Sequence, residues 1–346
     1  FSVVDGTLSV HTTDSTVANG LAAPVTWMDD ASNGISMEAY AGDLQGRVWE
    51  FPLDTATTTT TGSGSSAVTT TTYTADLISA GTKEFTADSG GTVQPITAGM
   101  LAGRDPVTGN VWVFFGTGQY LTSSDLTNKQ VQSWYGLIVQ AGKNQPDLPD
   151  LPTDTQSGDL VQRSITYEQD GDSTATPPTL SVRTVTTLPT PSDMSGKRGW
   201  YMDLEQPVTD TNGNVTGNNA QGERMVTPNQ FQGNLLLGTT RIPDAATNSD
   251  ICNSSGTGWV MAVDPFTGTN PGASFFLVNG GTGTVTLPGG QVVPVAGVGF
   301  TSLPNNPIFV GGDMLMSFDN GTTSNVNTSG ASGVPQRVSW QELVNP

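Results

Sequence analysis

The sequence contains one cysteine, Cys252, and one histidine, His11, among its 346 residues. A single cysteine excludes an intrachain disulfide and a cysteine-rich metal site. A single histidine excludes two-histidine zinc sites, including the HExxH motif. A Ser–His–Asp triad would have to use His11, whose Ser- and Thr-rich surroundings are typical of a surface strand, and the sequence has no GxSxG motif.

Basic residues are also scarce, because 12 Lys and Arg stand against 31 Asp and Glu, for a formal net charge of −19. Nucleic-acid binding requires clustered Lys and Arg that replace counterions, so this balance argues against DNA or RNA as a partner. It is compatible with an acidic extracellular surface and with divalent cations. Long apolar runs are missing as well, which excludes a membrane-spanning helix.

Only 12% of the residues are charged, but 35% are apolar, so the chain has enough apolar surface to fold around a core. The sequence has no initiator methionine and no signal-peptide pattern, and it opens inside a strand-like run. We therefore expect a single domain over residues 1–346 that is the C-terminal part of a longer exported protein.

Helical periodicity is absent apart from a short stretch near residues 123–133, and strand patterns dominate. The 42 glycines and 22 prolines interrupt the chain too often for a mainly helical protein. Strands are expected at residues 47–53, 111–121, 133–139, 234–242, 258–265 and 307–318. Strands that follow one another without helices between them predict an all-β fold: a sandwich, a barrel or a propeller.

Three segments of low complexity interrupt these strands: Thr55–Thr74, Gly142–Gly158 and Asp210–Gln221. Such segments bury little apolar surface, so we expect them to be exposed hairpin tips. A weak repeat joins a Gly-containing turn to a Trp-bearing strand in GDLQGRVWEFPLD, GRDPVTGNVWVFFGTG and GWVMAVDPFTG. Repeats at roughly 40–50 residues predict propeller blades, of which five to six fit in this chain. Most of the seven tryptophans are then expected to pack between blades rather than to bind sugar.

Seven stretches, taken in order, resemble the C-terminal β-propeller of the PilC/PilY family of type IV pilus tip-associated adhesins. They are YAGDLQGRVWEFPLD (40–54), GRDPVTGNVWVFFGTGQYL (103–121), QSWYGL (132–137), RGWYMDL (198–204), GERMVTP (222–228), GTGWVMAVDPFTG (256–268) and QRVSWQEL (336–343). The resemblance implies modified, quinoprotein-like blades, seven of them in the family. It also implies an exported protein at the pilus tip or outer surface of a Gram-negative bacterium. Family members promote attachment and assist pilus extension against retraction.

The resemblance further implies a calcium loop just before the YAGDLQG strand. In the family, acidic or amide oxygens lie at loop positions 1, 3, 5 and 9, glycine lies at position 6 and a carbonyl at position 7, a spacing that turns oxygens inward around a hard cation. Here Asp29, Asn33 and the Ile35 carbonyl match, whereas Ala31 and Met37 supply no ligand. We expect calcium to bind no more tightly than in the millimolar range, or not at all.

A one-residue slip of this alignment would use other oxygens but would move the glycine away from position 6. The side chains in that register are Asp30, Ser32, Ser36 and Glu38. The competing interpretation of the whole segment is an acidic hairpin loop that has lost the ion.

A second calcium candidate lies in the third low-complexity segment, where alternate residues carry oxygen atoms. These residues are Asp210, Asn212, Asn214, Thr216 and Asn218. An Asn-Gly-Asn sequence is more often an ordinary hairpin turn. Apart from calcium, no cofactor is expected.

The sequence favours a non-enzymatic adhesin module involved in pilus biogenesis, twitching motility and attachment. Its expected partners are the minor pilins of the pilus tip and a host or abiotic surface. The alternative is a quinoprotein-like oxidoreductase, because the DPVTGNVW and DPFTG turns also resemble the blades of those enzymes. The shortage of His and Cys, and the lack of an ordered acid–base set, favour the adhesin.

Overall fold

The computed structural model describes residues 2–4, 7–9, 19–76, 80–143, 145, 148–176, 178–187, 193–210, 215–244, 255–278 and 281–329. These ranges contain β-strands and three short 3-10 helices but no α-helix, which confirms the all-β class. The 3-10 helices are η1 (Gly64–Ser66), η2 (Ser123–Leu126) and η3 (Thr155–Ser157). The helical pattern near residues 123–133 thus corresponds to one turn only.

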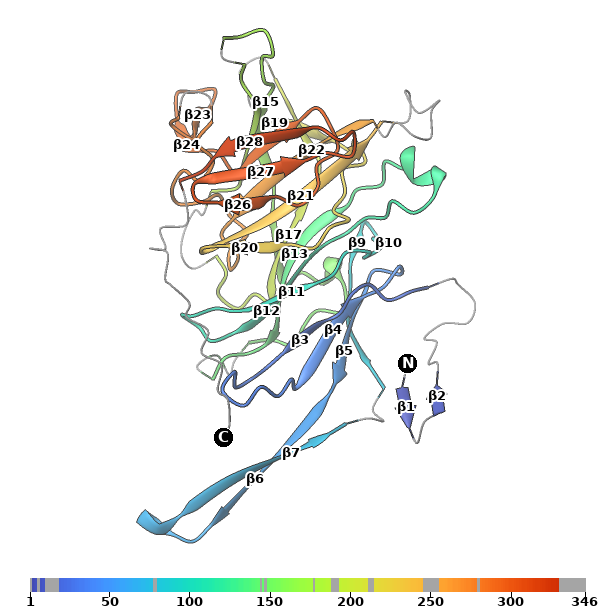
Figure 1. The fold of residues 1–346 in the computed structure, drawn as a ribbon, viewed down its shortest axis with the longest axis vertical. Helices are drawn as coiled ribbons and strands as arrows, with labels where there is room; N and C mark the ends of the chain where they lie inside the picture. Colours follow the sequence, from blue (N-terminus) through green and yellow to red (C-terminus); the bar gives the residue numbers. More distant parts are fainter. Residues whose placement is uncertain are drawn as a thin grey trace, which may run out of the picture.

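Four sheets form the body of the molecule. The first lies lowest in Figure 1, the second lies above it, and the third and fourth overlap in the upper part. The first sheet contains β3 (Val25–Trp27), β4 (Glu38–Gly42), β5 (Arg47–Pro52) and β8 (Thr82–Thr86). The second contains β11 (Leu101–Arg104), β12 (Val111–Gly116), β13 (Ser133–Gln140), β17 (Gly199–Asp203) and β14 (Leu160–Arg163). The third contains β15 (Ile165–Gln169), β16 (Ser181–Val185), β25 (Gly297–Phe300), β22 (Gly256–Val263), β21 (Leu235–Pro243) and β20 (Gln230–Gln232). The fourth contains β26 (Ile308–Val310), β27 (Asp313–Ser317) and β28 (Thr323–Asn327).

The remaining described strands pair in twos. They are β1 (Ser2–Val4) with β2 (Thr7–Ser9), β6 (Asp54–Thr61) with β7 (Val68–Ala75), β9 (Asp88–Ser89) with β10 (Thr92–Val93), β18 (Gln206–Thr209) with β19 (Val215–Asn219), and β23 (Thr284–Thr286) with β24 (Val292–Pro294). The pairing is antiparallel throughout the named strands of this part of the chain, apart from the parallel pair β14–β17.

Strand β12 shows how consecutive sheets pack face to face. Val113 and Phe115 point into an apolar cluster shared with the first sheet, whereas Trp112 and Phe114 belong to a cluster shared with the third. A further cluster joins the third sheet to the fourth, where Met314 is buried. Since both faces of β12 are buried, its sequence is a continuous apolar run rather than an alternating one.

The predicted strands are largely confirmed, with two changes. The run at 307–318 forms two strands, because Gly311 turns the chain between β26 and β27 with a φ of 63°. The run at 111–121 ends as a strand at Gly116. The prediction of tryptophan between sheets is confirmed for Trp112, Trp134, Trp200 and Trp259, which are buried. Four sheets of three or more strands are present in the described ranges, so the expected five to six blades stay a prediction.

One low-complexity segment forms an exposed hairpin, as expected, and the described part of a second is largely exposed. Thr55–Thr74 makes most of the β6–β7 ribbon, which projects from the body at the bottom of Figure 1. The segment 210–221 contains β19, whose residues are all exposed. The expectation for Gly142–Gly158 is wrong, because Gly142, Pro152 and Thr155 are buried. A hydrogen bond from the backbone N–H of Thr86 to the carbonyl of Thr153 ties this segment to the first sheet.

Candidate functional site

The predicted calcium loop connects β3 to β4 at the edge of the first sheet. Gly34 has a φ of 69°, the left-handed conformation that the glycine of such a loop requires. Asn33 uses both ends of its amide: its Oδ1 accepts from the backbone N–H of Ile35 at 2.8 Å, and its Nδ2 donates to the Tyr73 hydroxyl at 3.0 Å. The Asn33 oxygen expected to bind calcium is therefore already engaged by the loop itself.

A positively charged side chain lies next to the first loop position. Arg104 Nη2 is 3.9 Å from a carboxylate oxygen of Asp29, and it donates to the Asp29 carbonyl at 3.4 Å. The same guanidinium lies 5.2 Å from the centre of the Trp27 ring. A guanidinium beside the carboxylate provides the positive charge that an ion would otherwise supply, so this arrangement offers calcium only part of a coordination shell.

In the slipped register, too, some of the expected ligand atoms already form hydrogen bonds within the loop. Asp30 Oδ1 accepts from the backbone N–H of Ser32 at 2.8 Å and from its hydroxyl at 2.6 Å, and these bonds lower the pKa of Asp30. Burial, together with the nearby Asp29 and Glu50 carboxylates, raises the pKa of Glu38 to about 7. Within the described ranges no three His, Cys, Asp or Glu side chains are close enough together to hold a metal. Calcium binding here stays a prediction.

The second calcium candidate is only partly within the described residues, since Asn212 and Asn214 lie outside them. The Thr216 hydroxyl donates to the Val208 carbonyl at 3.2 Å across the β18–β19 hairpin. Thr216 therefore holds the hairpin together, as the turn interpretation expects. Cys252 and His11 also lie outside the described residues.

Arg183, which is 1% exposed, forms a buried cluster of charges on the third sheet that the sequence did not predict. The Arg183 guanidinium donates to Glu223 at 2.7 and 3.1 Å and to Glu168 at 2.5 Å, and it lies 3.9 Å from the centre of the Trp259 ring. The Thr240 hydroxyl donates to Glu223 at 2.6 Å. Burial tends to lower the pKa of Arg183, but the two carboxylates outweigh it and the pKa is raised. The only sequence signal was a charged residue inside an apolar strand.

A second buried network ties β13 and β17 of the second sheet to Gln94, which follows β10, and to Thr155 of η3. The Tyr135 hydroxyl donates to Gln94 Oε1 at 2.6 Å and lies 3.0 Å from the Thr155 hydroxyl. The Ser133 hydroxyl accepts from Gln94 Nε2 at 2.8 Å and donates to Asp203 at 2.6 Å. Burial raises the pKa of Asp203 more than these hydrogen bonds lower it. The second oxygen of Asp203 accepts from Gln162 Nε2 at 3.2 Å, so the polar groups of this network satisfy one another inside the fold.

The Asp residues of the DPVTGNVW and DPFTG turns bond to the backbone and side chains of their own turns. Asp105 accepts from the backbone N–H of Val107 at 2.8 Å and from the Thr108 hydroxyl at 2.5 Å. Asp264 accepts from the N–H groups of Phe266 and Thr267 at 2.9 and 3.1 Å. These carboxylates cap turns at the ends of strands, which is an ordinary use of Asp in a turn.

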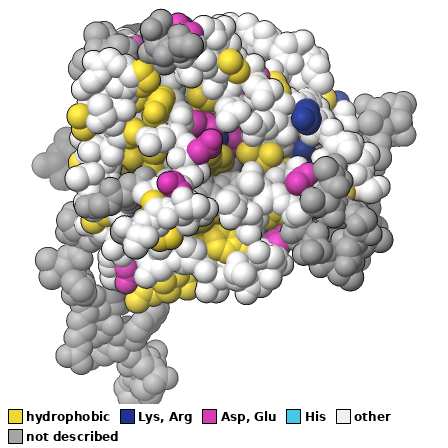
Figure 2. Space-filling model, turned by 90° about the horizontal axis from the view of Figure 1, so that it is seen from above, with side chains coloured by type: hydrophobic (Ala, Val, Ile, Leu, Met, Phe, Trp, Pro, Cys, Tyr) yellow, Lys and Arg dark blue, Asp and Glu magenta, His cyan; other side chains and the backbone are white. Residues whose placement is uncertain are grey.

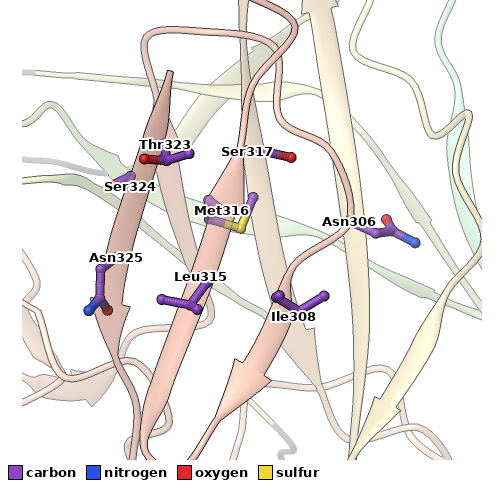
Figure 3. A pocket seen from close by; sticks show the side chains of 8 residues that line it. All are labelled: Asn306, Ile308, Leu315, Met316, Ser317, Thr323, Ser324 and Asn325. Carbon is purple, nitrogen blue, oxygen red and sulfur yellow. The ribbon is translucent and has the colours of Figure 1, made fainter. Parts of the chain in front are cut away.

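An open hollow of about 620 Å³ lies over the fourth sheet, and the side chains that line it carry no charge (Figure 3). They are Asn306, Ile308, Leu315, Met316, Ser317, Thr323, Ser324 and Asn325. None of these side chains is titratable, and the polar groups that they present are amides and hydroxyls. The end of the molecule seen in Figure 2 is likewise mostly uncharged, with scattered Asp and Glu and few Lys or Arg. No helix in the described ranges is long and apolar enough to cross a membrane.

Comparison with known proteins gives a consistent set of relatives. Residues 7–176 match the family model described as the PilY1 beta-propeller domain. A type IV pilus biogenesis factor PilY1 homolog of Xylella fastidiosa is 40% identical over 95% of this chain, and the PilY1 of Pseudomonas aeruginosa is 28% identical over 73% of it. The chain spans about a fifth of the length of these relatives, 22% and 21%.

A solved structure supports the fold. The crystal structure of the Pseudomonas aeruginosa PilY1 C-terminal domain superposes with a TM-score of 0.62 at 22% identity. The match covers 92% of this chain and 63% of that domain. At this identity the likeness establishes the propeller fold.

Proposed function

Because this chain belongs to the PilY1 β-propeller family, we propose that it is a non-enzymatic contact module of a type IV pilus biogenesis factor. In this proposal the parent protein acts outside a Gram-negative cell, at the pilus tip or on the outer surface. It assists pilus extension against retraction, supports twitching motility, and attaches the pilus to a host or abiotic surface. Minor pilins of the tip are its proposed neighbours.

The single observation that carries the proposal is the β6–β7 ribbon. Every residue from Thr55 to Thr72 is exposed, and the ribbon leaves the body of the molecule (Figure 1). Exposed elements held by a rigid scaffold are the usual place for contacts with a partner. The three apolar clusters between the sheets supply that scaffold.

The proposal of a non-enzymatic role is supported by how the polar groups are used. The Asp264 carboxylate caps a turn, Glu168 and Glu223 pair with Arg183, and the side chains that line the described hollow over the fourth sheet are not titratable. An oxidoreductase on the same fold is the alternative. It predicts dye-linked alcohol oxidation when the chain is given pyrroloquinoline quinone and calcium, and such turnover would overturn our proposal.

The test of the contact role uses the full-length protein in a piliated bacterium. Residues 56–73 are replaced by Asn-Gly, which links the cross-strand neighbours Thr55 and Thr74 by a short turn. We expect the pili to assemble and attachment to fall at least severalfold. The matched control shortens the β18–β19 hairpin instead. If attachment and twitching are unchanged by the loss of the ribbon, the ribbon is not the contact surface.

We also propose that calcium acts at the Asp29–Met37 loop only as a weak ligand. Isothermal calorimetry on the purified chain is expected to give a Kd in the millimolar range or no heat. At a calcium concentration equal to the Kd, linkage adds only about 0.4 kcal/mol to the free energy of unfolding. Micromolar binding that is lost in Asp29→Ala would contradict the proposal. Micromolar binding that is lost only in Asp30→Ala or Glu38→Ala would instead support the slipped register.

A further inference from the structure

We propose that the β6–β7 ribbon binds the same ribbon of a second copy of this chain, by antiparallel pairing of the two β6 edges. The inference rests on the proposed function in one respect: it takes the ribbon to be a contact surface and names the partner. The product is a two-fold dimer with a four-stranded ribbon between two propeller bodies.

The outer edge of β6 is open and unprotected. In the part of the chain that the structure describes, β6 pairs with β7 alone, in a register that runs from Asp54↔Ala75 to Thr61↔Val68 without a bulge. Natural edge strands are usually protected by charged residues, proline or bulges. Residues 55–75 contain no charged residue and no proline. Such an edge can accept another strand through its backbone N–H and C=O groups.

The side chains of β6 favour a partner with the same sequence. Across the ribbon, the hydroxyls of Thr58 and Thr71 lie 3.2 Å apart, and those of Thr60 and Thr69 lie 3.1 Å apart. Pairs of this kind stabilise neighbouring strands. The run Thr57–Thr61 consists of threonine only, so a two-fold axis at Thr59 would place Thr57 opposite Thr61 of the other copy. Each β6 side chain in this run then meets another threonine.

The β6 edge is favoured over the β7 edge because a β7 side chain is hydrogen-bonded to the body of the molecule near the base of the ribbon. Tyr73 on β7 receives a hydrogen bond from Asn33 at 3.0 Å, which ties β7 to the loop before β4. The run of threonines on β7 is also shorter and ends at Val68 and Tyr73.

Electrostatics decide the orientation of the two copies. A net charge of −19 opposes contact between two bodies, whereas the ribbon between Thr55 and Ala75 is uncharged. The eight residues of β6 span about 26 Å at about 3.3 Å per residue. That length exceeds the Debye length of about 8 Å at physiological ionic strength. Antiparallel pairing places the bodies at opposite ends of the ribbon, while parallel pairing would bring them side by side. The antiparallel arrangement is also the isologous, closed one.

Disulfide trapping tests the axis directly. In a Cys252→Ser background, Thr59→Cys places one thiol opposite its symmetry mate. Opposed Cα atoms of antiparallel strands lie about 4.5–5.5 Å apart, which a disulfide spans. We expect mild oxidation to convert most of the Thr59→Cys chain to a covalent dimer. Thr71→Cys, equally exposed but on β7, is the matched control and is expected to stay largely monomeric. Equal trapping of both variants would overturn the β6 axis.

A charge swap tests the pairing without a covalent bond. In Thr57→Lys/Thr61→Lys each lysine meets a lysine of the other copy, while its neighbours within the ribbon, Thr72 and Val68, stay neutral. Sedimentation velocity is expected to show at least a tenfold weaker dimer than in the unmodified chain. Thr57→Glu/Thr61→Glu is expected to behave the same way. Mixing the two variants is expected to restore the dimer.

Three outcomes would overturn the inference: an unmodified chain that stays monomeric at high micromolar concentration, a dimer that survives deletion of residues 56–73, or open-ended fibres. These measurements separate the inference from the proposed function. A monomeric chain whose ribbon deletion still abolishes attachment would refute the dimer and leave the contact role. A dimer whose loss leaves attachment unchanged would refute the contact role and leave the dimer.

Discussion

Arg183 is fully buried and neutralises two carboxylates, so its removal should be among the most destabilising single changes in the chain. Arg183→Met leaves Glu223, which is 2% exposed, without its cation. We expect the free energy of unfolding to fall by about 3–5 kcal/mol, as for other buried pairs that lose one partner. Urea denaturation measures the change.

A matched control comes from an exposed arginine. Arg104, whose side chain is 45% exposed, pairs with Asp29 at the surface. Arg104→Met should lower the free energy of unfolding by less than about 1 kcal/mol. Adding Glu223→Leu to Arg183→Met should recover part of the loss, and equal effects of the two arginine substitutions would contradict a buried ion cluster.

Asp203 should make stability depend on pH with a definite sign. Burial raises its pKa in the folded chain, so between the unfolded and folded pKa values the folded state holds a proton that the unfolded state has lost. The contribution of Asp203 to the free energy of unfolding is therefore complete below its pKa in the unfolded chain, about 3.9. This contribution is lost as the pH rises through the pKa of Asp203 in the folded chain. We expect Asp203→Asn to gain stability relative to the unmodified chain as the pH rises from 3.5 to 7, measured by thermal unfolding.

Asp172 provides a control of opposite sign. Hydrogen bonds from Thr174 lower its pKa, so its contribution is present above the unfolded pKa and is lost as the pH falls. Asp172→Asn should therefore lose stability relative to the unmodified chain as the pH rises through the same range. If the stability of Asp203→Asn and that of Asp172→Asn change in the same direction with pH, the opposite pKa shifts assigned to the two carboxylates are wrong.

Among the elements, the β6–β7 ribbon should be dispensable for folding. It contributes no residue to the three apolar clusters, and the entropy of loop closure changes slowly with length. Replacing residues 56–73 by Asn-Gly should shift the Tm by less than about 4 °C, which corresponds to about 1 kcal/mol for a large domain. A decrease of more than about 8 °C in differential scanning calorimetry would show that the ribbon supports the body.

The segment 142–158 should behave in the opposite way. The Thr155 hydroxyl accepts from the backbone N–H of Asp88 at 3.0 Å and contacts the Tyr135 hydroxyl at 3.0 Å. Thr155→Val removes the acceptor of the buried Asp88 N–H, while the Tyr135 hydroxyl keeps its bond to Gln94, so the free energy of unfolding should fall by about 1–3 kcal/mol. Thr153→Val, two residues earlier and exposed, is the control, and both are compared in urea.

For the molecule as a whole, the charge of −19 should make the folded state sensitive to salt. Self-repulsion destabilises the compact state and is screened as ionic strength rises, whereas the buried Arg183 cluster is screened much less. Raising NaCl from about 10 mM to 200 mM should therefore raise the Tm by a few degrees. A Tm that falls with salt would show that surface ion pairs outweigh the repulsion.

The sequence could predict features that depend on local pattern. Apolar and aromatic runs, such as 133–139, became strands, and the charge-poor Thr tract became an exposed hairpin. The Asp turns followed from the same local chemistry, because a carboxylate reaches the N–H groups two and three residues further on. The calcium loop kept its glycine geometry, but two residues that are distant in the chain also contact it. Arg104 donates to the Asp29 carbonyl, and the Tyr73 hydroxyl accepts from the Asn33 amide nitrogen.

The sequence by itself therefore determined the all-β class, the positions of most strands and the hairpin inserts, because these follow from periodicity, composition and turn chemistry within a few residues. Only the tertiary structure decided which strands share a sheet, as when β25 pairs with β22 and β16 in the third sheet. It also brought Arg183 to Glu223, 40 residues away, and buried Gly142, Pro152 and Thr155 in the segment that composition had marked as a free tip. Burial and ion pairing depend on which surfaces meet when residues distant in the chain come together. The local pattern of residue types along the sequence does not specify those contacts.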